Sequence, residues 1–145
     1  MKFTICIDEN REEEVLVYAR GVSDFTRKLE QLCREECAEL LGYREGQVLR
    51  LRAADIVCVI IESGRVLALT GQGEYQLKDR MYVLEERLGD GFLKLNQSCL
   101  ANISQIDRFD ASLTGTLTVH FKNGYRDYVS RRNLKHVKER FGMKR

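Results

Sequence analysis

Two short polar segments carry the side chains best suited to contact an anionic polymer. Ser130-Arg131-Arg132-Asn133 stands where a predicted strand runs into a helix, and Asn96-Gln97-Ser98 interrupts an apolar strand. Arginine reads guanine, and asparagine or glutamine reads adenine, through paired hydrogen bonds. The arginines thus favour an anionic partner, whereas the residue types of the second segment are also those of an ordinary polar turn.

The start of the last predicted helix is cationic. Arg131 and Arg132 fall in its first turn, after Ser130, which suits the N-cap position. Two cations there oppose the helix dipole, at a cost of about 0.3–1 kcal/mol each for exposed groups. Exposed arginines tolerate such a cost, whereas a bound polyanion would remove it. The polar surface continues along the helix through Asn133, Lys135 and Lys138.

Charge is unevenly distributed along the 145 residues. Residues 1–90 carry 13 lysines and arginines against 18 aspartates and glutamates, a net charge of −5. Residues 91–145 carry 11 against 4, a net charge of +7, so that the whole chain carries +2. A basic segment of this kind indicates a nucleic acid or another anionic surface as partner. A solvated basic face is the alternative that charge alone leaves open.

Metal, disulfide and membrane chemistry find little support. The five cysteines are odd in number and irregularly spaced, without a Cys-x-x-Cys motif. Buried or half-buried free thiols are the preferred interpretation, although Cys33 and Cys37 lie one helical turn apart. No apolar run approaches the roughly 20 residues of a membrane span, and the N-terminus is charged too early for a signal peptide. We therefore expect a cytoplasmic protein without metal or cofactor.

The one hint of catalysis is a histidine–aspartate pair. A two-residue turn at Asn123-Gly124 would place His120 opposite Asp127 on the paired strands. No serine or cysteine nucleophile is placed by the sequence to complete such a pair. We interpret it as a surface cross-strand pair and do not expect an enzyme.

Residues 1–42 are predicted to form a small strand-strand-helix unit. Phe3, Ile5 and Ile7 alternate with polar or small residues, a turn follows at residues 8–11, and residues 15–18 form a second apolar run. A helix is predicted from Ser23 to about residue 41. Its end is expected at Gly42.

From residue 43 to residue 145 strands predominate. An amphipathic helix is indicated by Leu77, Met81, Leu84 and Leu88, and a last helix by the spacing of Leu134, Val137 and Phe141. The predicted strands are residues 48–52, 56–61, 66–70, 74–77, 92–95, 99–101, 103–109, 117–121 and 125–129.

Four pieces in this second part resemble the LytTR DNA-binding domain of bacterial response regulators. They are an apolar strand that ends in a charged turn, a short helix, an aromatic-basic-loop-Ser-apolar-Asn segment and the Val-Ser-Arg-Arg step, at residues 56–65, 81–88, 92–102 and 129–132. Their order and spacing agree with the family over roughly 100 residues. The resemblance implies a mainly β fold, an elongated antiparallel β-sheet core with short helices, here preceded by the strand-strand-helix unit.

The resemblance also implies roles for individual residues. A base-reading loop falls at Asn96, Gln97 and Ser98, and a base-contacting arginine falls at Arg132, beside Arg131. Phosphate contacts are expected from Lys94, Arg126, Lys135 and Lys138. A first recognition loop maps to Ser63, Gly64 and Arg65. In this chain that loop is short and lacks a histidine that some family members have.

The implied partner is double-stranded DNA with repeated short sites, bound by a homodimer. The helix predicted after Ser23 is the expected dimer contact. Residues 1–42 replace the receiver domain that usually precedes this module, so control by phosphorylation is not expected. Some stand-alone members are restrained by a membrane protein, which makes such a partner a second expectation. The alternative function is a protein-interaction or anti-regulator module that keeps the fold without binding DNA.

Overall fold

Ten strands and three α-helices make up the described chain in the computed structural model. The structure describes residues 1–37 and 39–143, without the side chains of residues 34–37. The helices are α1 (Asp24–Cys37), α2 (Met81–Leu88) and α3 (Arg131–Arg140). The strands are β1 (Glu39–Arg44), β2 (Gln47–Arg52), β3 (Ile56–Glu62), β4 (Arg65–Thr70), β5 (Gly73–Leu77), β6 (Phe92–Asn96), β7 (Cys99–Asn102), β8 (Ile106–Ala111), β9 (Leu117–Phe121) and β10 (Arg126–Val129). Single 3₁₀ turns, η1 (Ala53–Asp55), η2 (Gly89–Gly91) and η3 (Ile103–Gln105), each lead into a strand.

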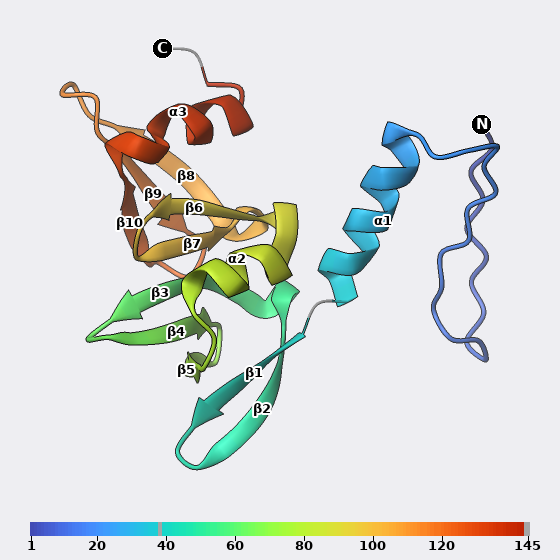
Figure 1. Ribbon diagram of the computed structural model, residues 1–145, viewed down its shortest axis with the longest axis horizontal. Coiled ribbons are helices and arrows are strands. Elements are labelled where there is room, and N and C mark those ends of the chain that lie inside the picture. Colours follow the sequence, from blue (N-terminus) through green and yellow to red (C-terminus); the bar gives the residue numbers. More distant parts are fainter. Residues whose placement is uncertain (38, 144–145) are drawn as a thin grey trace.

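The strands form two antiparallel sheets, so the expected mainly β fold is confirmed (Figure 1). The larger sheet has the order β2-β1-β5-β4-β3-β7-β6, and the smaller has the order β10-β9-β8. Helix α2 packs on one face of the larger sheet, through Met81, Leu84 and Leu88. The smaller sheet and α3 cover the other face.

Strand β3 is buried on both faces, which explains its continuous apolar run. Ile56 and Val59 belong to the core under α2, whereas Cys58 and Ile60 belong to the core under the smaller sheet. The pairing of β3 with β4 shifts between Ile56 and Cys58, so that Val57 lies on the same side as Cys58. This bulge reverses the alternation of the strand and supplies apolar side chains to both cores.

The two strands predicted within residues 1–20 do not form. The turn between them is present, because the backbone N–H groups of Asn10 and Arg11 donate to Asp8. The apolar side chains on either side stay in solvent, with Phe3 86% and Ile7 92% exposed. A lone pair of strands without a packed face is at best marginally stable. The chain therefore doubles back at this turn without strand pairing in the single copy (Figure 1).

The predicted helix begins where expected and ends earlier than expected. The Ser23 hydroxyl accepts from the Thr26 N–H at 3.3 Å, and the Thr26 hydroxyl accepts from the Ser23 N–H at 2.9 Å. Helix α1 stops at Cys37, however, and residues 39–42 are the first part of strand β1. The prediction of a helix to residue 41, ended by Gly42, is therefore wrong.

Gly42 explains why β1 can pack there. It lies opposite Leu49 on β2, and a Cβ atom at this position would stand 2.6 Å from Leu51 Cδ1 and 2.9 Å from Tyr75 Cβ. The sheet thus needs the absence of a side chain at residue 42.

The β9–β10 hairpin has a different register from the predicted one. Phe121 donates its N–H to the Tyr125 carbonyl at 2.8 Å, and Gly124 donates its N–H to the Phe121 carbonyl at 3.0 Å. The loop therefore has three residues, with Gly124 at φ 93°, as in a type I turn followed by a left-handed residue. His120 faces Arg126, and its Nε2 lies 2.6 Å from the Asp110 carboxylate. The predicted His120–Asp127 pair is wrong.

The close approach at Gly42 predicts a selective loss of stability. Gly42→Ala should lower the free energy of unfolding by about 1–3 kcal/mol, because the added methyl group overpacks the β1–β2–β5 contact. Gly71→Ala is the matched control, since a Cβ atom there would meet nothing within 4 Å. Urea unfolding of both variants measures the difference. Equal stability of Gly42→Ala and the native protein would contradict this packing.

Candidate nucleic-acid interface

The buried side chain of Asn96 fixes the turn between β6 and β7 through hydrogen bonds. Its side chain is only 3% exposed. Its amide nitrogen donates to Asp127 Oδ1 at 3.0 Å and to the Tyr128 carbonyl at 2.8 Å, and its oxygen accepts from the Ser98 N–H at 2.8 Å. Both donor hydrogens are therefore used inside the protein, and the expectation that Asn96 reads a base does not fit this geometry.

Asp127, a partner of Asn96, is itself held by further hydrogen bonds. Asp127 also accepts from the Tyr125 hydroxyl at 3.0 Å and from the Tyr128 N–H at 2.8 Å. Burial, together with the neighbouring Asp127 carboxylate, raises the pKa of Tyr125 above its ordinary value. The phenol stays protonated and can keep donating to Asp127. This network joins β10 to the β6–β7 turn.

The tip of that turn and the start of α3 are neighbours. Gln97 and Ser98 are exposed, and so are Arg131 and Arg132. The Ser130 N–H donates to the Leu95 carbonyl at 2.9 Å, which fastens the first residue before α3 to strand β6. The structure therefore brings together two segments that lie more than thirty residues apart in the sequence.

The first turn of α3 has an open N-terminus. Ser130 occupies the predicted N-cap position, but its side chain forms no capping hydrogen bond and instead accepts from Asn133 Nδ2 at 3.1 Å. Asn133 is thus engaged within the helix start. Backbone N–H groups at a helix N-terminus bind anions readily, and they lie here beside two arginines. Within the described chain, neither Arg131 nor Arg132 pairs with a carboxylate.

The rest of α3 divides into an apolar and a cationic side. Leu134, Val137 and Phe141 pack against the core, as their spacing predicted. Arg131, Lys135 and Lys138 follow one another at i, i+4 and i+7, so they lie along one face of the helix. These three cations form a stripe that begins at the N-terminus of α3 and continues along the helix toward its C-terminus.

The β3–β4 turn lies at the same edge of the larger sheet as the β6–β7 turn. The Ile61 N–H donates to the Ser98 carbonyl at 3.0 Å, so the end of β3 runs beside the β6–β7 turn (Figure 1). Ser63 and Gly64 have φ angles of 51° and 74°, which makes a tight two-residue turn between Glu62 and Arg65. Ser63 and Arg65 are exposed at its tip.

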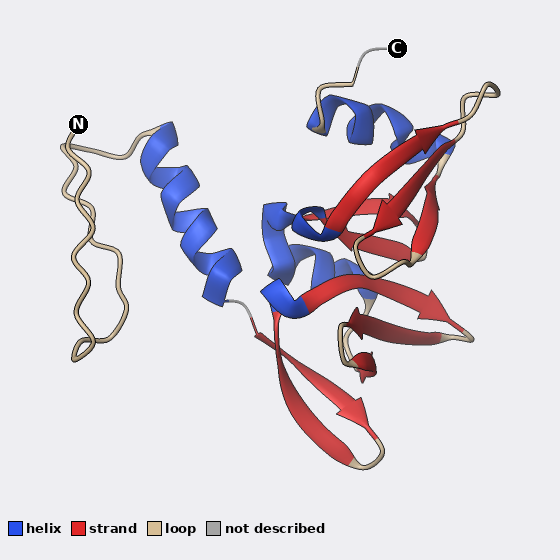
Figure 2. Cartoon of the chain, turned by 180° about the vertical axis from the view of Figure 1, so that it is seen from behind, coloured by secondary structure: helices blue, strands red, loops and turns tan. Residues whose placement is uncertain are grey.

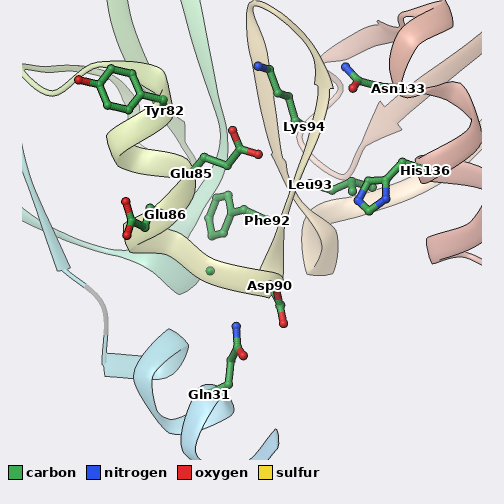
Figure 3. A pocket seen from close by; sticks show the side chains of 11 residues that line it. Gln31, Tyr82, Glu85, Glu86, Asp90, Phe92, Leu93, Lys94, Asn133 and His136 are labelled. Atoms are coloured by element: carbon green, nitrogen blue, oxygen red, sulfur yellow. The ribbon is translucent and has the colours of Figure 1, made fainter. Parts of the chain in front are cut away.

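Lys94 on β6 lies between the cationic residues of α3 and a group of carboxylates. It lines a pocket together with Asn133 and His136 of α3 (Figure 3). The opposite wall is acidic, with Glu85 and Glu86 on α2 and Asp90 on η2. A phosphate at Lys94 would approach from the α3 side, because the carboxylates repel it from the other.

Two further exposed side chains border the interface. Arg126 and Tyr128 alternate with half-buried Asp127 on β10, so they share its outer face. Tyr128 was not among the residues expected from the sequence to contact DNA, although its position two residues after Arg126 and two before Ser130 indicates the same surface. An exposed aromatic ring beside a basic surface can stack on a base or pack on a sugar.

The four cysteines whose side chains the structure describes are free and differ in burial. Cys58 and Cys99 are free and buried, Cys33 is half-buried, and Cys6 is exposed against expectation. The side chain of Cys37, one helical turn after Cys33, lies outside the described residues. The hydrogen bond to Cys58, followed by burial, raises the pKa of Cys99, which keeps that thiol neutral. No group of three or more potential metal ligands occurs in residues 1–37 and 39–143.

Membrane insertion through a helix has no candidate in the described ranges. None of α1, α2 and α3 has both the length and the apolar character needed to cross a bilayer.

Comparisons with known proteins agree with this picture. Residues 46–142 match the model of the LytTR family, described as LytTr DNA-binding domain. Two uncharacterized HTH-type transcriptional regulators of Staphylococcus aureus, from strains N315 and MRSA252, are each 25% identical over 146 residues. Each alignment covers 99% of this chain and 99% of the relative.

A solved structure shares the fold. The LytTr DNA-binding domain of a putative methyl-accepting/DNA response regulator from Bacillus cereus superposes with a TM-score of 0.69 at 14% identity. The match covers 73% of this chain and 98% of the solved one. The expectation that the chain is not an enzyme agrees with the family. The chain belongs to the LytTR family of DNA-binding domains.

Proposed function

We propose that this protein is a sequence-specific transcriptional regulator that reads the major groove of double-stranded DNA. The observation that carries the proposal is the common edge formed by the β6–β7 turn and the open, unpaired N-terminus of α3. Two hydrogen bonds of Asn96 tie the β6–β7 turn to β10, which leads into α3, and a third closes the turn itself at Ser98. Rigid presentation of exposed Gln97, Ser98 and Arg132 is what base reading needs.

The side chains divide between base reading and positioning. Arg132 suits guanine, Gln97 suits adenine, and Ser98 suits either, at about 1–3 kcal/mol for each good paired contact. Arg131, Lys135, Lys138 and Lys94 would contact phosphates, which fix the register without reading sequence. Ser63 and Arg65, on the neighbouring turn, would contact the next segment of the backbone.

Asn96 and Asn133 act on this surface indirectly. Asn96 is a positioning residue that holds the β6–β7 turn, and Asn133 orients the start of α3 through Ser130. Action on chromosomal DNA places the protein in the cytoplasm of a bacterial cell. Two copies are expected on repeated sites, because one module presents few base-reading side chains for a typical affinity of about 10⁻⁸ M or tighter.

A protein-interaction or anti-regulator role is the second candidate. The acidic character of residues 1–90 and of the pocket wall at Glu85, Glu86 and Asp90 favours it. A regulatory membrane protein is one such partner. The two roles are compatible if the acidic side meets protein while the α3 side meets DNA.

Selection of genomic fragments by the full-length protein separates the two roles. Enrichment of a repeated short motif at moderate salt is expected for a DNA-binding regulator. Fragments recovered at low salt without any shared motif would refute sequence-specific binding and leave the interaction role.

Arg132→Ala should reduce affinity for the selected site by about 1–3 kcal/mol and relax the preference at one base position. The stability of the protein should stay equal or rise slightly, because a cation leaves the helix N-terminus. Lys138→Ala is the comparison, since loss of a phosphate contact should weaken all sequences alike and lower the salt slope by about one. Binding titrations on randomised sites at several salt concentrations give both readouts. A folded Arg132→Ala protein with unchanged affinity and base preference would show that Arg132 reads no base.

Asn96→Ala should lower the free energy of unfolding by about 1–3 kcal/mol, because Asp127 Oδ1 and the Tyr128 carbonyl lose the hydrogen bonds that the Asn96 amide donates to them. Asn96→Asp should cost more at neutral pH, since it places a second carboxylate against Asp127. That excess should shrink as the pH falls through the carboxylate range and the new group is protonated. Gln97→Ala is the control, with an expected change under about 0.5 kcal/mol at an exposed site. Urea unfolding between neutral and acidic pH tests the order, and equal stability of Asn96→Asp and Gln97→Ala would contradict it.

A further inference from the structure

The first 33 residues expose a long series of large apolar side chains. They come from the two extended stretches before and after the turn at Asp8 and from helix α1. We call them the N-terminal apolar surface, which consists of Phe3, Ile5, Ile7, Val15, Leu16, Val17, Tyr18, Phe25 and Leu32. Single exposed apolar residues are ordinary, but so many within one short segment indicate an interaction surface.

Local order in this segment distinguishes it from a featureless tail. The turn at Asp8 is closed by the N–H groups of Asn10 and Arg11. Arg11 forms an ion pair with Glu14 at 3.2 Å. The reciprocal hydrogen bonds of Ser23 and Thr26 then start α1. Figure 2 shows the extended stretches standing apart from the two sheets, whereas α1 contacts η1 and η2. Phe25 and Leu32 of α1 nevertheless remain about half exposed.

The area is sufficient for a stable interface. An aromatic side chain buries about 150–250 Å² when fully covered. Phe3 and Tyr18 are almost completely exposed, and Phe25 is about half exposed. With the aliphatic residues added, the surface reaches the roughly 800 Å² per partner of a standard interface.

The charges select the kind of partner. The turn segment from Asp8 to Glu14 contains five carboxylates and a single arginine, Arg11. Such a turn is repelled by DNA phosphates and by anionic lipid, so neither suits the surface. A second copy of the chain does suit it, because a two-fold axis places the same apolar stripe on both sides. An antiparallel arrangement also keeps the two acidic turns at opposite ends.

The backbone points to how the copies would meet. Phe3, Ile5 and Ile7 alternate as in a strand with one apolar face, yet these residues form no strand in the single chain. Strand addition between chains supplies the missing backbone hydrogen bonds together with a covered face. We propose that residues 3–7 and 15–18 form an intermolecular β-sheet with a second copy of this chain, covered by Phe25 and Leu32 of α1.

This proposal deepens the expectation, made under the proposed function, that two copies bind repeated sites, and it uses none of the residues assigned to base or phosphate contacts. Its test is sedimentation equilibrium of the full-length protein at micromolar concentrations. The native protein should have twice the chain mass of 16.8 kDa. Phe3→Glu combined with Tyr18→Glu should give the mass of one chain, with an unchanged unfolding temperature measured at dilutions where the native protein is also monomeric. Leu113→Glu is the matched control, because Leu113 is an equally exposed apolar residue in the β8–β9 loop, and it should remain dimeric.

Hydrogen exchange reports on the strands themselves. Amides of residues 3–7 and 15–18 should be protected in the native protein and lose protection in the double variant. A native protein that stays monomeric, a dimer that survives both glutamate substitutions, or a dimer without protected amides in these stretches would each overturn the proposal. Binding of the double variant to a single half-site should be unchanged, so a failure here is distinguishable from a failure of DNA reading.

Discussion

The surface that we assign to DNA depends on one buried amide. Asn96 is one of two polar side chains in the described core, the other being Asn102. Each accepts an N–H from the residue two positions later and donates to carbonyl groups far along the chain. A buried amide is stable only when its donors are satisfied, and Asn96 satisfies both on β10. Because β10 leads directly into α3, the same contact sets where Arg131 and Arg132 stand relative to Gln97 and Ser98.

The sheets supply the rigid frame for that contact. Strand β3 is buried on both faces and pairs with β7, which fixes the position of the β6–β7 turn. The Leu95 carbonyl on β6 accepts a hydrogen bond from the Ser130 N–H and so fixes the start of α3. The three helices are separated by strands along the described chain and do not form a helix-turn-helix pair. This arrangement supports contacts to DNA through turns and the start of one helix. It does not support insertion of a recognition helix.

Much of the frame could be predicted from the sequence because the relevant signals are local. The apolar run of β3, the spacing of Leu134, Val137 and Phe141, and the left-handed turn residues are each encoded within a few positions. The predictions failed where the conformation of a segment depends on residues far away in the sequence. Residues 39–42 continue a helical pattern equally well, and pairing with the distant strand β2 makes a strand of them. The loop of the β9–β10 hairpin differs by one residue from the predicted turn, which moved His120 away from Asp127. Asn96 looked like an exposed reader because its partners lie 31 and 32 residues away.

The central claim is that one edge of the molecule meets DNA. Its most direct test is a titration of the ¹⁵N-labelled protein with a duplex carrying the selected site, followed by amide chemical shifts. The largest changes should fall at Gln97, Ser98, Arg131 and Arg132, with smaller ones around Ser63, and the β1–β2 turn at Glu45 and Gly46 should not respond. Changes concentrated on the acidic side of α2, with the β6–β7 turn and the start of α3 unaffected, would contradict the account.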